Sequence, residues 1–165
     1  MTASHPAPHG ADDRAIPPTA LLLGAAGVLP FVVLALAALL RLEDRVALPP
    51  GLARAGLVAY GVVIVSFLGG VRWGVGLSRP DKATWMFVVS VLAPIAAWGA
   101  LFMPRPHDIA ILVGCFLVLG ISDVMLAAQG TVPRWYGTLR GILTTAVVAV
   151  LVFALAMLPL ADLPQ

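Results

Sequence analysis

Residues 54–77 read RAGLVAYGVVIVSFLGGVRWGVGL, with one charged residue, Arg72, after the first position. A helix crosses the hydrocarbon core of a membrane with about 20 mainly apolar residues. This stretch is long enough, and its unbroken apolarity exceeds what a strand of a membrane barrel shows. We therefore predict that residues 54–77 cross a lipid bilayer as a helix.

The composition of the whole chain indicates the same class of protein. Of the 165 residues, 61% are hydrophobic and 11% are charged, whereas a soluble domain has about 25% charged residues. The formal net charge is only +2 and the basic residues are scattered, which argues against nucleic acid as a partner. The expected partners are the lipid bilayer and other membrane proteins.

Four further stretches have the same apolar character. The predicted fold is all-α, a polytopic integral membrane bundle of five transmembrane helices at about residues 19–40, 54–77, 83–102, 107–128 and 135–160. Short connections make consecutive helices antiparallel neighbours. The first run, of about 22 residues, is longer than the apolar part of a cleaved signal peptide, which favours a retained helix. Residues 1–18 are polar and rich in proline and alanine, so we predict a disordered N-terminal tail before a membrane domain at 19–160.

The basic residues carry a weak signal of orientation. With five crossings, the end of the bundle that holds the N-terminal tail would carry five lysines and arginines, and the other end four. Cytoplasmic loops of membrane proteins carry the excess of basic residues. This bias predicts a cytoplasmic N-terminus.

Small residues mark the predicted contact faces of two helices. In helix 54–77 they form two stripes on different faces, and in helix 135–160 they form one row, with a spacing of four residues along a stripe. Small residues at this spacing let membrane helices approach closely. The predicted packing positions are Ser66, Gly69, Gly70, Gly74, Gly137 and Gly141. We expect packing within the chain rather than a dimer motif, with helix 54–77 at the centre of the bundle.

Charged side chains within a membrane span are costly unless they are paired. Arg72 and Asp123 each lie about six residues past the middle of helices that run in the same direction, so both lie roughly 9 Å from the midplane. Arg140 begins the last helix at about that level. We predict that Asp123 bridges Arg72, with Arg140 as a second partner. The predicted buried polar cluster consists of Arg72, Trp73, Asp123, Trp135, Tyr136 and Arg140.

Three roles are open for such a cluster. The leading interpretation is a clamp that fixes the register of three helices. A second is a binding site for an anionic head group or a proton-linked solute, because net positive charge near one interface attracts lipid phosphate. In the third, the long side chains simply extend to the interface.

Several chemistries lack the residues that they need. The histidines are His5 and His9 in the tail and His107 at a helix start, which leaves no facing pair for haem and no zinc ligand set. The serines within the spans have no histidine or lysine at their depth to act as a base. We therefore predict no catalytic residue, no cofactor and no metal, and we expect that the chain is not an enzyme.

Two motifs resemble those of a known family. Residues 60–74, YGVVIVSFLGGVRWG, resemble the signature helix of the DUF3429 family, and residues 133–140, PRWYGTLR, with Asp123 upstream, resemble its second motif. The resemblance covers about residues 17–160 and leaves out the N-terminal tail. It implies a small multi-helix protein of the bacterial inner membrane, with mitochondrial relatives called transmembrane protein 69, and it implies no particular activity.

The function expected from these observations is a non-enzymatic accessory or assembly role through helix–helix contacts. A small transporter or channel that acts as an oligomer is the alternative, although a continuous polar path would be needed. A lipid- or quinone-binding membrane protein is the third reading.

Overall fold

The computed structural model describes residues 14–79 and 83–161, and it is helical throughout these ranges apart from the connections. The six helices are α1 (Pro18–Leu39), α2 (Leu42–Arg45), α3 (Leu52–Ser78), α4 (Ala83–Ala100), α5 (His107–Ala128) and α6 (Arg134–Ala161). Most of the predicted N-terminal tail, residues 1–13, lies outside the described residues.

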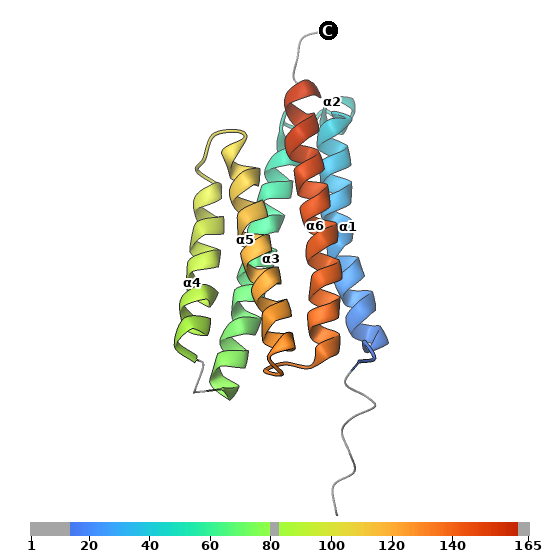
Figure 1. The fold of residues 1–165 in the computed structure, drawn as a ribbon. Coiled ribbons are helices and arrows are strands. Elements are labelled where there is room, and N and C mark those ends of the chain that lie inside the picture. The colour runs from blue at the N-terminus through green and yellow to red at the C-terminus, as the bar shows by residue number, and fades with distance from the viewer. Residues whose placement is uncertain (1–13, 80–82, 162–165) are drawn as a thin grey trace, which may run out of the picture.

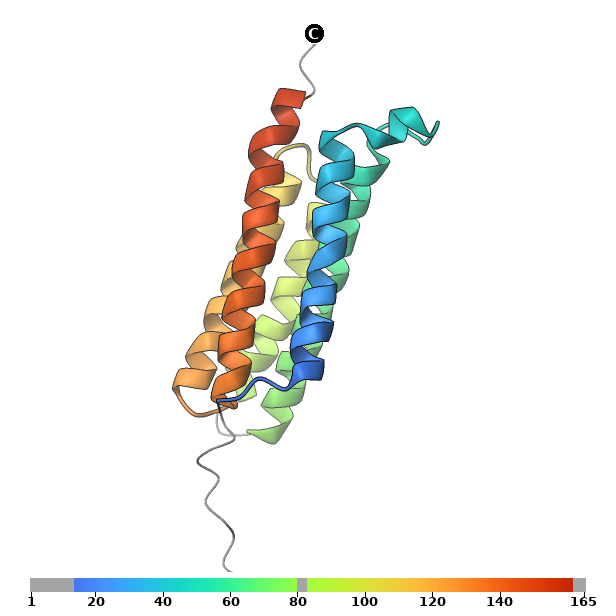
Figure 2. The same cartoon turned by 90° about the vertical axis from the view of Figure 1, so that its right-hand side faces the viewer.

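The five long helices lie side by side, and each runs antiparallel to the long helix before it (Figure 1). Because the number of long helices is odd, α1 begins at one end of the bundle and α6 ends at the other, as both views show (Figure 2). Helix α1 contacts α3 and α6, and α5 contacts α3, α4 and α6. The end of α3, the end of α5 and the start of α6 therefore lie at the same end of the bundle.

Four helices are long and apolar enough to cross a membrane, namely α1, α3, α5 and α6. The apolar helix Thr84–Ala100 is shorter, because α4 ends at Ala100 instead of residue 102 and turns follow it before Pro104. The 18 residues of α4, Ala83–Ala100, extend about 27 Å, slightly less than the roughly 30 Å of a hydrocarbon core. The structure thus shows an all-helical membrane bundle with four candidate spans, and five spans remain a prediction.

The buried core takes side chains from all five long helices, and aromatic rings of α1, α3 and α5 meet within it. Phe31 packs edge-on against Tyr60 and Phe116, with ring centroids 4.9 and 5.6 Å apart. The Tyr60 hydroxyl donates to the Gly27 carbonyl at 3.0 Å, which satisfies the polar end of this ring. A Cβ on Gly61 would lie 2.7 Å from the Leu112 side chain, so α3 and α5 can approach this closely only with glycine there.

The second small-residue stripe of α3 packs against α4. A Cβ on Gly69 would lie 2.5 Å from the Ser90 carbonyl oxygen and 2.8 Å from the ring of Pro94. A Cβ on Gly76 would lie 2.8 Å from Phe87. These glycines let α4 lie directly on the α3 backbone. In the last helix, a Cβ built on Gly137 would lie 2.4 Å from the Cβ of Ala127 in α5, so α5 and α6 also approach closely there.

The first stripe of α3 does not pack within the chain, which corrects the prediction for Ser66, Gly70 and Gly74. All three are exposed, and no atom lies within 4 Å of a Cβ built on either glycine. Gly141 makes only an ordinary contact, 3.7 Å from Val124. Since one face of α3 has no neighbour, α5 rather than α3 is the more central helix, with 44% against 33% of its span buried.

The loop between α1 and α3 contains the short helix α2, which the sequence did not predict. Acidic residues in a loop are usually solvated, but Glu43 of α2 is buried. Its carboxylate accepts the backbone N–H of Gly51 at 3.0 Å. Gly51 has a φ of +79°, a conformation that costs glycine little, and α3 begins directly after it.

Candidate functional site

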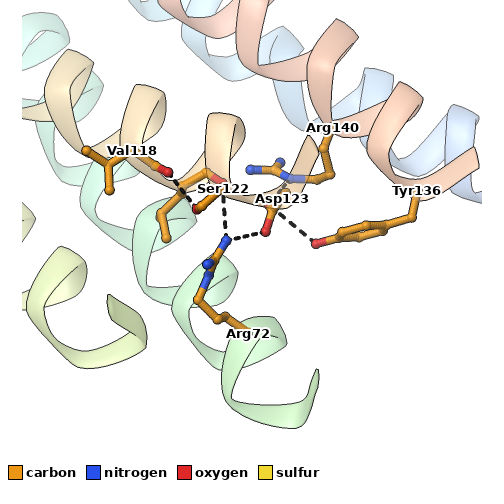
Figure 3. Close-up of polar contacts among 7 residues, drawn as sticks. Arg72, Val118, Ser122, Asp123, Tyr136 and Arg140 are labelled. Carbon is orange, nitrogen blue, oxygen red and sulfur yellow. Dashed lines mark hydrogen bonds and ion pairs between the residues drawn. The ribbon is translucent and has the colours of Figure 1, made fainter. Parts of the chain in front are cut away.

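Asp123 of α5 lies between two arginines from different helices (Figure 3). Arg72 of α3 donates from Nη2 to Oδ1 at 2.5 Å, and Arg140 of α6 donates from Nε to Oδ2 at 2.7 Å. The three residues are buried, with 2%, 5% and 7% of the surface of Arg72, Asp123 and Arg140 exposed. The Tyr136 hydroxyl lies 3.5 Å from the same Oδ2. We call Arg72, Asp123 and Arg140 the polar triad.

The polar triad forms because the three helices place these residues at one level. Arg72 comes six residues before the end of α3, Asp123 five before the end of α5, and Arg140 six after the start of α6. At 1.5 Å per residue, all three lie about 8–9 Å from the same end of the bundle. The structure therefore brings together the arginine, aspartate and second arginine that the sequence predicts.

The hydrogen-bonding capacity of the polar triad is only partly used. Arg72 Nη2 also donates to the Leu119 carbonyl at 3.3 Å, but its Nε and Nη1 have no hydrogen-bond partner among the described residues. The guanidinium of Arg72 lies 5.3 Å from the centre of the Trp85 ring, a distance at which the ring face attracts a cation. Two guanidinium groups share one carboxylate, so the polar triad has a formal excess of one positive charge.

The two predicted tryptophans are not part of the polar triad. Trp73 is 45% exposed and packs on Phe87, with ring centroids 4.7 Å apart. Trp135 is half-buried, and its ring lies 6.1 Å from that of Tyr136. The tryptophan that contacts Arg72 is Trp85, which the sequence analysis did not select. It lies in the first turn of α4, at the same end of the bundle as Arg72, which is the signal that could have pointed to it.

A second buried ion pair joins α3 to α5 at the other end of the bundle. Arg54 and Asp108 form a bidentate pair, with Nη1 on Oδ2 and with Nη2 on Oδ1 at 2.7 Å. Both side chains are nearly buried. The sequence analysis did not predict this pair. Both residues lie in the first turn of helices that run in the same direction, which is the signal that could have predicted the pair.

Together, the two sites act as clamps near both ends of α3 and α5. The paired residues are 18 positions apart in α3 and 15 apart in α5, which corresponds to about 27 and 23 Å along the helices. Removing one partner of a buried ion pair costs about 3–5 kcal/mol, because a charge is left uncompensated. A one-turn slip between α3 and α5 would break both sites, so their register is strongly determined.

We next consider whether the described residues could bind a metal ion or supply an activated nucleophile. The described part of the chain has no group of three or more His, Cys, Asp or Glu side chains that could hold a metal ion. Ser66 donates to the Val62 carbonyl at 2.8 Å, and Ser122 donates to the Val118 carbonyl at 2.6 Å. These hydroxyls bond to carbonyls of their own helices.

Comparisons with known proteins extend the resemblance noted in the sequence. The model of the family described as "Protein of unknown function (DUF3429)" matches residues 16–156. A protein named Transmembrane protein 69 from Xenopus tropicalis is 41% identical over 144 residues, which cover 84% of this chain and 54% of that protein. The mouse protein of the same name is 33% identical over 89 residues, 50% of this chain and 35% of that protein. This chain thus spans about half the length of the Xenopus relative and about a third of the mouse relative. No solved structure matches it significantly.

Proposed function

This chain belongs to the DUF3429 family of proteins of unknown function, and we propose that it is a non-enzymatic accessory or assembly protein of a membrane. Its partner is another membrane protein, and the contact is a transmembrane helix of that partner on the outward face of α3. The role is one of scaffolding, with no reaction assigned to any residue.

The single observation that carries this proposal is the unpacked small-residue stripe of α3. Ser66, Gly70 and Gly74 are exposed at a spacing of four residues, and the space beside both glycines is open. Between membrane helices, association depends on close packing because lipid is as apolar as the side chains. A stripe of this kind therefore fits another helix better than it fits the disordered chains of bulk lipid. Phe67 and Leu77 are exposed beside it and would form the rims of such a contact.

The ion pairs support the proposal because they fix α3 against α5, on the side of α3 away from the exposed stripe. Arg54 and Arg72 both reach from α3 to α5, near opposite ends of the helix. The outward face of α3 is therefore presented by a helix whose register within the bundle is set. A partner helix would meet a rigid surface and would not have to order it, which lowers the entropic cost of association.

The setting of the protein is part of the same proposal. We infer five crossings, with α4 as the short fifth span, in the inner membrane of a bacterium and with a cytoplasmic N-terminus. The apolarity of Thr84–Ala100 supports a span, and α4 lies alongside α3 and α5 for most of its length (Figure 1). A short span is accommodated by local thinning of the bilayer at modest cost.

Site-specific crosslinking tests the proposed contact. A photo-crosslinking residue at Gly70 should capture a defined membrane protein in native membranes, and the same residue at Gly114 of α5 should not. Gly114 is the matched control because it is also exposed in a helix with open space beside it. The capture should be lost in the variant Gly74→Leu, which fills the stripe.

Two results would decide against this function. Equal capture from the Gly70 and Gly114 positions would show that the stripe has no special partner. Crosslinks between two copies of this chain would instead favour the alternative of an oligomeric transporter or channel. Thermal unfolding of Gly74→Leu in detergent should match that of the unmodified chain, because the added side chain meets no atom of the bundle.

A further inference from the structure

A narrow apolar groove of about 150 Å³ runs between α1, α3 and α6, with Phe116 of α5 also lining it. Leu23 of α1 and Phe67 of α3 line it and are 72% and 65% exposed. The groove therefore opens sideways, toward the lipid that surrounds a membrane bundle. Gly27 lines it as well, and nothing lies within 4 Å of a Cβ built there, so this glycine keeps the groove open.

One part of the groove is polar. Arg140 and Thr144 line it, one helical turn apart on α6, and each is more than nine-tenths buried. Arg140 Nη2 and Thr144 Oγ1 have no hydrogen-bond partner among the described residues. Figure 3 shows the Arg140 guanidinium beside Asp123, with only its Nε used by the carboxylate. Two buried donors thus meet in one place without an acceptor, and such donors are costly to leave unpaired.

The hydroxyl of Thr144 differs from the other hydroxyls of the bundle. Ser122 and Thr145 donate to a carbonyl four residues back in their own helix, at 2.6 and 2.8 Å. This is the usual way for a membrane helix to satisfy a hydroxyl. Thr144 makes no such bond, although it lies next to Thr145 in the same helix. Its Oγ1 is buried against α5, 2.4 Å from where a Cβ on Gly120 would lie, so a molecule in the groove reaches this hydroxyl only when the side chain turns.

Charge and depth identify the chemistry of that molecule. The polar triad has a formal excess of one positive charge, since Asp123 is shared by two arginines, and this favours an anion over a neutral carbonyl compound such as a quinone. Helix α6 has 28 residues and is longer than the hydrocarbon core, which places Arg140 within about 5 Å of the edge of that core. Phosphate groups of lipids lie just outside this edge, within reach of an arginine side chain.

We propose that the groove binds one anionic glycerophospholipid. An acyl chain lies between α1 and α6, beside Gly27. Once the two buried side chains turn toward the groove, the phosphate accepts hydrogen bonds from Arg140 Nη2 and Thr144 Oγ1. Arginine suits this role because its planar donors bind phosphate while one of them remains on Asp123. The groove shares Phe67 with the rim of the proposed helix contact, but its two polar donors lie on α6, so lipid binding can be tested separately from that contact.

Native mass spectrometry of the full chain in detergent tests the site, with dioleoylphosphatidylglycerol and dioleoylphosphatidylcholine as the probes. One molecule of the anionic lipid should bind at least about tenfold more tightly than the zwitterionic lipid, as expected for hydrogen bonds to a charged group. Thr144→Val removes one donor without changing the shape of the side chain and should weaken binding of the anionic lipid about tenfold. The same variant should reduce the ratio between the affinities for the anionic and the zwitterionic lipid.

Filling the groove is the second arm of the test. Gly27→Leu should reduce binding of both lipids by tenfold or more, while the matched variant Gly114→Leu, on an open face outside the groove, should leave it unchanged. Equal affinity for the two lipids, or full binding to Gly27→Leu, would overturn the proposal. So would a bound ubiquinone that excludes the anionic lipid. Thermal unfolding of each variant without added lipid shows whether the fold is intact, and Thr144→Val loses only an unpartnered hydroxyl.

Discussion

A double-mutant cycle on the polar triad tests the claim that one aspartate serves two arginines. We consider Arg72→Met, Arg140→Met and their combination, because methionine keeps much of the apolar volume of arginine without its charge. In either single variant Asp123 retains one charged partner, at 2.5 or 2.7 Å. Each single variant loses one hydrogen bond between charged groups, which corresponds to about 1.5–3 kcal/mol of stability.

The combined variant is expected to be much worse than the sum of the two. It leaves the Asp123 carboxylate buried with no cation, and this uncompensated charge adds about 2–3 kcal/mol to the two separate losses. Its other contact is the Tyr136 hydroxyl at 3.5 Å, which is too long to compensate. We expect a coupling free energy of about 2–3 kcal/mol, the upper end of what contacting residues show.

The free energies of unfolding can be measured by denaturant titration in detergent micelles, with circular dichroism as the signal. Losses that add to within about 0.5 kcal/mol would refute the shared carboxylate, because independent sites behave in that way. Arg79→Met on the exposed end of α3 is the control and should change stability by less than about 0.5 kcal/mol.

Three further outcomes are expected from the same measurement. Asp108→Asn should lower the free energy of unfolding by about 3–5 kcal/mol, because Arg54 loses a bidentate partner; a loss below about 1 kcal/mol would mean that this pair is solvated. Gly69→Val should destabilise the bundle by about 1–3 kcal/mol through overpacking against the α4 backbone, whereas Gly70→Val on the open face should lose well under half of that, and equal losses would contradict the assigned faces. Tyr60→Phe should lower stability by about 0.5–1.5 kcal/mol, since one hydrogen bond to α1 disappears, and no change at all would argue that α1 does not dock as described.

The exchange of charges between Arg72 and Asp123 illustrates how the structure changes an expectation. If Asp123 paired with Arg72 alone, the exchange Arg72→Asp with Asp123→Arg should restore stability. In the structure Arg140 also lies on Asp123, and the exchange would place a guanidinium against it. Stability should therefore return only when Arg140→Met is added as a third change, and recovery without it would contradict the geometry of the triad.

Some features of this protein follow from the order of residues alone. The apolar runs and their lengths predict membrane helices, and the common level of Arg72 and Asp123 follows from counting residues along helices that rise 1.5 Å per residue. Alternating direction then brings Arg140 to the same end. These quantities are one-dimensional, because a membrane restricts helices to lie roughly side by side, and they need no knowledge of which helices are neighbours.

The tertiary structure decided which face of each helix points into the bundle and which helices are neighbours. The spacing of small residues on α3 shows two stripes of equal quality, but only the Gly69 stripe packs, and the Gly70 stripe is exposed. The pairing of Arg54 with Asp108 and the choice of Trp85 over Trp73 also depend on which helix lies against α3. The helical period determines the angles between side chains on one helix, but the direction of a face is set only when all the helices pack together.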